Sequence, residues 1–261
     1  MKALYIASTG MSAQETNVEV ISNNIANMRT TGYKRQRAEF QDLLYQQIRR
    51  SGSATSGQGT IAPVGIEIGS GVKTAATPRV MSQGTPTPTE KELDVAVRGE
   101  GFFIVNLPDG RTAYTRDGSF ERSADGQLVN VDGYAIQPGI TIPDDATSVS
   151  ISADGTVEAF IGSSTVATQI GQLQLARFVN KAGLASAGNN LFLETASSGP
   201  AQVGTPNTDG VGDLLQGYLE ASNVNSVTEI ADLIAAQRAY EMNARVISGA
   251  DQMMQATSQL R

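Results

Sequence analysis

The chain has 261 residues, enough for one or two domains, and it contains no His, no Cys and no Trp. Without His and Cys it lacks the commonest general base, thiolate nucleophiles, disulfides and cysteine-type zinc sites, although catalysis by Asp, Glu, Lys or Ser stays open. The net charge of −7 argues against nucleic-acid binding, which requires clustered Lys and Arg.

The N-terminal stretch MKALYIASTGMSAQETN does not resemble a secretory signal peptide, because Ser8, Thr9, Gln14 and Glu15 interrupt its apolar residues. No run of about 18 apolar residues occurs, so no segment is expected to span a membrane. Taken alone, these two features predict a cytoplasmic protein.

A long amphipathic helix is predicted at the N-terminus. Its apolar or small residues are spaced alternately by three and four positions, with Gln14 in one slot, as in the seam of a coiled coil. Gly32 is a plausible stop signal for this helix. The seam residues are Leu4, Ala7, Met11, Val18, Ile21, Ile25 and Met28.

Three asparagines, Asn23, Asn24 and Asn27, lie near the end of this helix. Because Asn is a mediocre helix former, their presence needs a reason. Either they cap a fraying helix end, or their side chains form hydrogen bonds that fix the register of the helix against neighbouring subunits. The basic residues that follow, Lys34-Arg35 and Arg37, are expected to form a solvated charged segment.

A connecting region follows. Residues 51–60 are rich in Gly and Ser and predict a flexible loop. Val64, Ile66 and Ile68 then alternate with other residues, which predicts an extended segment.

The middle of the chain is predicted to be β-rich. From Leu93 the apolar residues recur with period two, and residues 102–105 form a short apolar run. Asp-Gly pairs between such runs are strong hairpin cues. The pattern predicts an all-β sandwich or barrel-like domain that ends near Leu193, with residues 197–213 as a return connection. Pairs of this kind begin at Asp109, Asp117, Asp125, Asp132 and Asp154.

A second long helix is predicted from about Val224 to Leu260, because this stretch contains no Pro and repeats the alternation of three and four. If the two terminal helices pair, the whole middle is an insertion in a helical hairpin, which loop-closure entropy tolerates. The seam of this helix would consist of Ile230, Leu233, Gln237, Tyr240, Ala244, Ile247, Asp251 and Met254.

Candidate chemical sites are weak. The Gly99-x-Gly101 pair lacks the third glycine of a dinucleotide fingerprint, and a strand is expected after it. The Asp-Gly pairs suit turns better than calcium, because no EF-hand pattern is present. A carboxylate pair for acid–base catalysis stays open, since pairing in space is invisible in a sequence.

The two ends resemble a known family. The segments SNNIAN and TTGYK near the start, and QRAYEMN near the end, are similar to the terminal signatures of the bacterial flagellar rod and hook axial proteins. The stretches LDVAVRGEGFFIV, AYTRDGSF and DGQLVNVDGYAIQP resemble the β domain of this group, and FQDLLYQQIRR with its Gly/Ser-rich continuation resembles the distal rod members. Ser226 departs from the pattern, because relatives often carry an apolar residue there.

This resemblance implies an α+β fold with three parts. Residues 1–35 and 218–261 would form a coiled-coil-like inner core of paired long helices, residues 36–75 an extended β connector, and residues 76–217 an all-β outer domain. The assembly seam would comprise Leu4, Met11, Val18, Ile21, Ile25, Met28, Ile230, Leu233, Tyr240, Ile247 and Met254, with Asn23, Asn24 and Asn27 as its polar register.

The resemblance also implies a function. The chain would be a structural subunit of the flagellar distal rod, a hollow helical drive shaft that transmits torque from the motor to the hook. Its partners would be copies of itself, other rod proteins, the hook protein and the surrounding rings, with no cofactor, no nucleic acid and no membrane insertion. It would reach the periplasm by flagellar type III export, without a cleaved signal peptide.

Alternatives are a proximal rod or hook protein and, from different classes, a periplasmic cell-wall hydrolase or an adhesin-like binding module.

Overall fold

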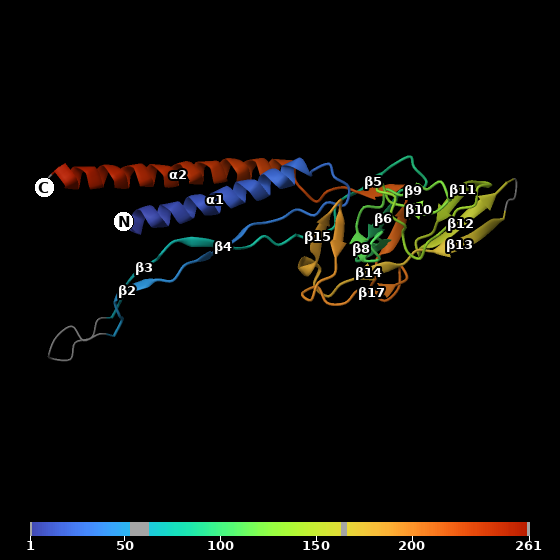
Figure 1. Cartoon of the computed structure of the whole chain (residues 1–261), viewed down its shortest axis with the longest axis horizontal. Helices are drawn as coiled ribbons and strands as arrows, with labels where there is room; N and C mark the ends of the chain where they lie inside the picture. Colours follow the sequence, from blue (N-terminus) through green and yellow to red (C-terminus); the bar gives the residue numbers. More distant parts are fainter. Residues whose placement is uncertain (1, 53–62, 163–165, 260–261) are drawn as a thin grey trace. The chain divides into compact units, whose positions relative to one another are not determined.

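The computed structural model describes residues 2–52, 63–162 and 166–259 (Figure 1). Helices at both ends and many strands between them confirm the predicted α+β class. The chain divides into two compact units. The first comprises Met1–Ile25, Gln36–Pro78 and Ser226–Arg261, and the second comprises Ala26–Arg35 and Arg79–Asn225. Most of the loop predicted at 51–60 lies outside the described residues.

The first unit contains the two long helices, α1 (Lys2–Ala26) and α2 (Ser226–Gln259). At 1.5 Å per residue their 25 and 34 residues correspond to about 37 and 51 Å. Neither helix contains Pro, so no backbone donor is missing from its interior. Helix α1 ends at Ala26. A turn follows it, in which the Thr30 amide donates to the Asn27 carbonyl.

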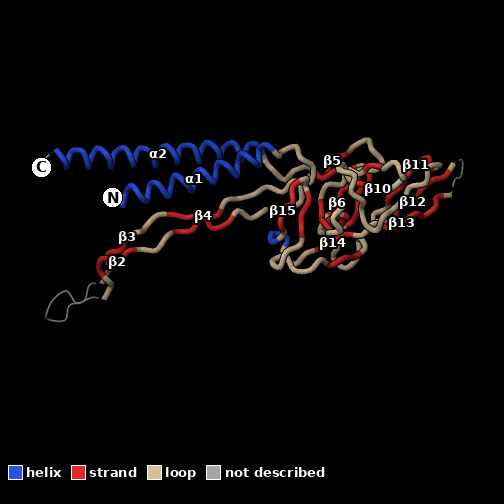
Figure 2. Tube along the Cα trace, viewed as in Figure 1, coloured by secondary structure: helices blue, strands red, loops and turns tan. Residues whose placement is uncertain are grey.

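The connector in the first unit is a two-stranded antiparallel ribbon (Figure 2). Strand β1 (Glu39–Asp42) pairs with β4 (Val72–Ala76), and β2 (Gln46–Arg49) pairs with β3 (Ile66–Ile68). The extended segment predicted around Val64 to Ile68 is therefore confirmed as β3 from Ile66.

The second unit is built on a six-stranded antiparallel sheet with the order β15-β16-β8-β7-β14-β17. The hairpin of β7 and β8 turns at Asp109-Gly110, where Gly110 has a φ of 82° that favours glycine. The strands are β7 (Phe102–Asn106), β8 (Thr112–Thr115), β14 (Leu175–Arg177), β15 (Ala185–Gly188), β16 (Leu191–Leu193) and β17 (Gln202–Gly204).

Smaller sheets complete this unit. A three-stranded sheet contains β11 (Ala146–Ile151), β12 (Thr156–Ile161) and β13 (Ala167–Gln172), and a short 3-10 helix spans Lys181–Gly183. Three pairs join β5 (Pro86–Pro88) to β19 (Tyr218–Glu220), β6 (Val95–Arg98) to β18 (Asp213–Gln216), and β9 (Glu121–Arg122) to β10 (Leu128–Val129).

The predicted end of the β domain near Leu193 is wrong. Strands β17, β18 and β19 follow it, and β18 and β19 pair with strands more than a hundred residues earlier. Frequent Gly, Pro and Asn in this segment favour a connection, but cross-strand pairing overrides local composition.

The core of the second unit lies on both faces of β7. Phe103 and Val105 belong to one buried cluster, and Phe102 and Ile104 belong to the other. A strand covered on both faces needs apolar residues at every position, which explains the uninterrupted run in the sequence. Edge-to-face ring pairs stabilise both clusters, with centroid distances of 4.9 Å for Phe103–Phe120 and 5.9 Å for Phe102–Phe178.

Candidate functional site: the helix pair and a buried ion cluster

The helices α1 and α2 run antiparallel and side by side (Figure 1). Near the end of α1, the Asn24 side chain donates to Glu229 Oε2 at 3.1 Å. Near its start, a Cβ on Gly10 would lie only 2.9 Å from Asn243 Nδ2. The same fourteen-residue step separates Gly10 from Asn24 and Glu229 from Asn243. That step is two heptads, as expected when helices pack along a repeat of 3.5 residues.

The predicted seam residues of the two helices differ in exposure. Met28 lies after the end of α1 and is exposed, so it is not part of that helix. Ile21 is buried; Leu4, Met11, Val18, Ile25, Leu233 and Ile247 are half-buried; Ile230, Tyr240 and Met254 are exposed.

The residues of α2 that are buried in the structure are Glu229, Ala236 and Ala250. Together with the half-buried Leu233 and Ile247 they form one stripe along the helix. This stripe shares Leu233 and Ile247 with the predicted seam, but elsewhere it lies one residue earlier than the seam residues Ile230, Gln237 and Asp251. The prediction missed Glu229 and the two alanines because it favoured large apolar side chains, whereas closely packed helices also bury small residues.

The opposite face of α2 carries large apolar side chains that remain exposed. Val227 is 76% exposed and Met253 is 66% exposed, so most of their apolar surface is in contact with water, which is unfavourable. This exposed stripe consists of Val227, Ile234, Met242 and Met253, with the exposed Ile230 and Val246 at its edges.

A groove of about 550 Å³ lies between the two helices. Two of its lining side chains, Val18 and Tyr240, belong to the predicted seam, so the structure brings these residues from opposite ends of the chain together. The remaining lining residues are Glu15, Glu19, Gln237 and Glu241.

Among the three asparagines, Asn24 joins three segments of the first unit. Its Nδ2 atom donates to the Gln36 carbonyl at 2.8 Å, and its Oδ1 atom accepts from the Gln36 amide at 2.9 Å. The third contact is the one with Glu229, and both side chains are buried. Asn23 is exposed, and Asn27 accepts from the Thr30 hydroxyl in the turn after α1.

The connector contacts α1 through Thr9. The Thr9 hydroxyl donates to the Ile6 carbonyl and accepts from the Val72 amide, and a Cβ on Gly71 would lie 2.2 Å from its Oγ1 atom. Glycine at this position lets the ribbon approach the helix. Elsewhere the ribbon exposes large apolar side chains, which are Leu44, Tyr45, Ile48, Val64 and Ile66.

The second unit contains a buried ion cluster that no pattern in the sequence indicates. Lys34 Nζ forms an ion pair with Glu220 Oε1, and both side chains are almost fully buried. Arg116 Nη1 lies 3.4 Å from Glu220 Oε2, while its Nη2 donates to the Gly99 carbonyl at 2.6 Å. Lys34 was expected to be solvated, and this expectation is wrong. Burial lowers the pKa of Lys34 and that of Arg116, and the attraction of Glu220 opposes both shifts.

Backbone contacts hold the cluster in place. The Gly84 amide donates to Glu220 Oε1 at 2.8 Å, and Lys34 Nζ donates to the Ser82 carbonyl at 2.9 Å. The Gly32 amide donates to the Glu220 carbonyl, and a Cβ on Gly32 would lie 2.8 Å from the Arg116 carbonyl carbon. Gly32, predicted only as a helix stop, therefore also allows close packing at a φ of 66°.

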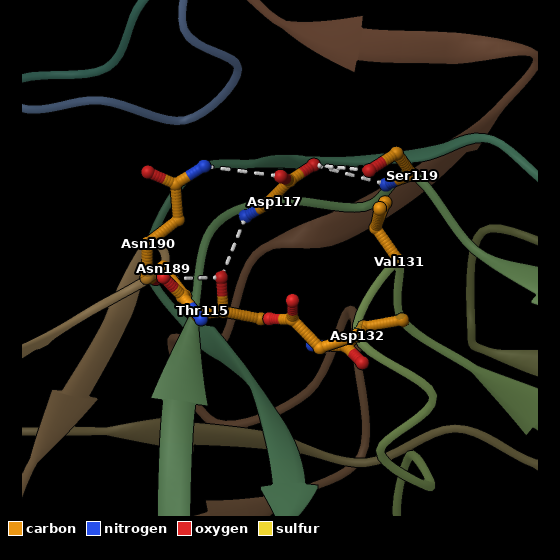
Figure 3. A pocket seen from close by; sticks show the side chains of 8 residues that line it. Thr115, Asp117, Ser119, Val131, Asp132, Asn189 and Asn190 are labelled. Atoms are coloured by element: carbon orange, nitrogen blue, oxygen red, sulfur yellow. Dashed lines mark hydrogen bonds between the residues drawn. The ribbon is translucent and has the colours of Figure 1, made fainter.

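A polar pocket of about 240 Å³ lies beside β8 (Figure 3). The Asp117 carboxylate in it accepts from the Ser119 hydroxyl at 2.7 Å and from Asn190 Nδ2 at 3.1 Å. Both oxygens of the Asp117 carboxylate therefore already accept hydrogen bonds from this chain. The other lining residues are Thr115, Asn130, Val131, Asp132 and Asn189.

Within residues 2–52, 63–162 and 166–259, no three or more Asp or Glu side chains gather in a way that would hold a metal ion. In the same part of the chain, neither long helix combines the length and apolar character needed to cross a membrane.

Three family models match the chain. The model "Flagella basal body rod protein" matches residues 4–34, "Flagellar hook protein FlgE/F/G D1 domain" matches 96–159, and "Flagellar basal body rod FlgEFG protein C-terminal" matches 215–260. Lys34, Arg116 and Glu220 each fall in a different matched segment, so the ion cluster joins all three.

Curated proteins match over the full length. The "Flagellar basal-body rod protein FlgG" of Caulobacter vibrioides is 57% identical over 261 residues, covering 100% of both chains. The protein of the same name from Agrobacterium fabrum is 52% identical, covering 99% of this chain and 98% of that one. The "Flagellar hook-basal body complex protein FlhP" of Bacillus subtilis is 29% identical over 100% of both chains. This chain belongs to the flagellar basal-body rod protein family and is a structural protein of the flagellar rod, not an enzyme.

Proposed function

We propose that the chain is a subunit of the distal rod that self-assembles into a hollow helical drive shaft, which transmits torque from the motor to the hook. The observation that carries this proposal is the exposed apolar stripe on α2, opposite the face that packs on α1. Burying each large side chain of the stripe would contribute about 1.5–3 kcal/mol. A contact between two different faces is heterologous, and where the rotation from copy to copy does not close into a ring it propagates as a helical tube.

The three parts of the chain would have different roles. Residues 1–35 and 218–261 would contain the inner core, in which coiled-coil-like helix pairs surround a central channel, and residues 76–217 would form the outer β domain. The fourteen-residue step between the two helix contacts supports the coiled-coil-like packing. In the structure, residues 26–35 and 218–225 group with the β unit, so these two segments would link the core to the outer domain.

Residues 36–75 would bridge neighbouring subunits and stiffen the rod. Supporting this role, the ribbon exposes apolar side chains such as Leu44 and Ile48, which are 90% and 61% exposed. Deleting residues 46–65 should give a more flexible rod, measured as a shorter persistence length in electron micrographs. An equally straight deletion product would refute the stiffening role and leave the assembly role intact.

The other partners would be further rod proteins, the hook protein and the surrounding ring proteins, and the location would be the periplasmic part of the basal body, reached by flagellar type III export. Asn23, Asn24 and Asn27 would fix the register of the core.

The direct test is negative-stain microscopy of the concentrated purified protein. Straight tubes are expected, whereas a protein that stays monomeric at every concentration would overturn the proposal. Labelling in isolated basal bodies would distinguish a distal from a proximal or hook position.

A further inference from the structure

We propose that the groove between α1 and α2 binds a second copy of this chain through the face of α2 that does not pack on α1. Ion pairs between glutamates of the groove and Arg238 and Arg245 of the second copy would select this contact. The inference rests on the proposed self-assembly and specifies the surface through which two copies meet.

The groove is acidic as well as apolar. Its lining includes Glu15, Glu19 and Glu241, around the apolar Val18 and the half-exposed ring of Tyr240, and it contains no Lys or Arg. All three glutamates are exposed. Three carboxylates around one groove repel one another, so a cationic partner relieves this repulsion when it binds.

The opposite face of α2 has the complementary character. Ile234, Arg238, Met242 and Arg245 follow one another at steps of four, four and three residues, so they lie on one face of the helix. All four are exposed. Within the described residues, neither arginine forms an ion pair with a carboxylate of its own chain. We call these four residues the basic stripe.

The charge spacing of the two surfaces agrees. On the basic stripe, seven residues separate Arg238 from Arg245, which is about 10 Å along the helix. In the antiparallel pair Asn243 lies level with Gly10, so Glu241 lies level with residue 12. Glu19 is seven residues further along α1, again about 10 Å. The two arginines of one copy and the two glutamates of the next would therefore have the same spacing along the helix axis, and each guanidinium can bind a carboxylate with two hydrogen bonds.

The contact uses two different surfaces of the same molecule. Each copy would present the groove and the basic stripe as two different surfaces, which adjoin on α2 at Glu241, so the interaction is heterologous and continues from copy to copy. Apolar side chains within each surface, Val18 and Tyr240 in the groove and Ile234 and Met242 in the stripe, would supply burial, and the charges would supply selectivity.

The test is charge reversal in the full-length protein, with assembly followed by sedimentation and negative-stain microscopy. The groove variant is E19R/E241R, the stripe variant is R238E/R245E, and the third variant carries all four substitutions. E90R/D125R changes the net charge as the groove variant does, but at exposed positions of the β unit. Circular dichroism of each variant confirms that helical and β content are retained.

We expect the groove variant and the stripe variant each to require about tenfold or more protein for assembly, because like charges then face each other. The variant with all four substitutions should assemble within about threefold of the wild-type concentration, since complementarity is restored with reversed signs. E90R/D125R should match the wild type.

Assembly of both double variants at the wild-type concentration would overturn the proposal. It would also be overturned if the variant with all four substitutions required as much protein for assembly as the double variants. If the wild type itself formed no tubes, the proposed function would fail as well. The wild-type arm therefore separates the two failures.

Discussion

Lys34 and Glu220 form an ion pair in the interior of the β unit although 186 positions separate them in the sequence. Lys34 belongs to the segment that follows α1, and Glu220 belongs to β19, a few residues before α2. The pair therefore fastens both ends of the β unit to each other. Moving these charges out of water is costly, which is why the pKa of Lys34 is lowered by burial in spite of the attraction of Glu220.

Replacing Glu220 should destabilise the β unit more than replacing Lys34. Glu220→Gln leaves both Lys34 and Arg116 buried without their carboxylate, which should lower the free energy of unfolding by about 3–5 kcal/mol. Lys34→Met should cost less, because Glu220 keeps Arg116 and the Gly84 amide as partners. Chemical denaturation followed by circular dichroism measures both losses.

The matched control for this experiment is Arg98→Met, which removes the ion pair between the exposed Arg98 and the half-buried Asp213 and should have a smaller effect. If Lys34→Met proved as harmful as Glu220→Gln, the hierarchy inferred from the contacts would be wrong.

Asn24→Ala should loosen the helix pair. The substitution removes the two hydrogen bonds to the Gln36 backbone and the one to Glu229, all in a buried setting, at a cost of about 1–3 kcal/mol. Thermal unfolding of the helices at 222 nm, in the assembled protein, measures this cost. Ser22→Ala, at an exposed position of the same helix, serves as the control, and equal melting of the two variants would argue against the role of Asn24.

Gly84→Ala should destabilise the β unit by about 3 kcal/mol or more. An alanine Cβ at this position would lie 1.8 Å from the Ala221 carbonyl oxygen, so one of the two backbone segments must move. Gly249→Ala is the contrasting case, because the site lies in α2 and, apart from the adjacent residues and backbone of its own helix, no atom of the described residues lies within 4 Å of the added Cβ. It should stabilise the helix by up to about 1 kcal/mol. Both values come from denaturation curves, and a tolerated Gly84→Ala would contradict the close approach.

Hydrogen exchange in a dilute monomer should divide the chain. We expect rapid exchange over α1 and α2, whose apolar faces stay incompletely buried, and slow exchange over residues 93–195, where the two core clusters lie. Mass spectrometry of peptides after short labelling times checks this pattern. Slow exchange over both helices in the monomer would show that the helix pair needs no second copy.

The sequence by itself determined the elements. Alternation of three and four positions predicted both terminal helices, and the period of two with Asp-Gly turns predicted the hairpin at Asp109-Gly110. These signals are local, because each one reflects a repeat that a short segment must satisfy on its own. The similarity of the two ends to rod proteins was likewise visible in short motifs, and it indicated the family.

Only the tertiary structure decided which residues meet. Lys34 looked like a solvated cation, and nothing near it in the sequence indicates Glu220 or Arg116, since partners brought together by folding leave no periodic signal. The register of α2 was equally hidden, because small side chains such as Ala236 and Ala250 carry little hydrophobic signal yet allow the closest packing. Likewise, β18 and β19 find their partners across the whole unit, where backbone pairing prevails over a composition typical of loops.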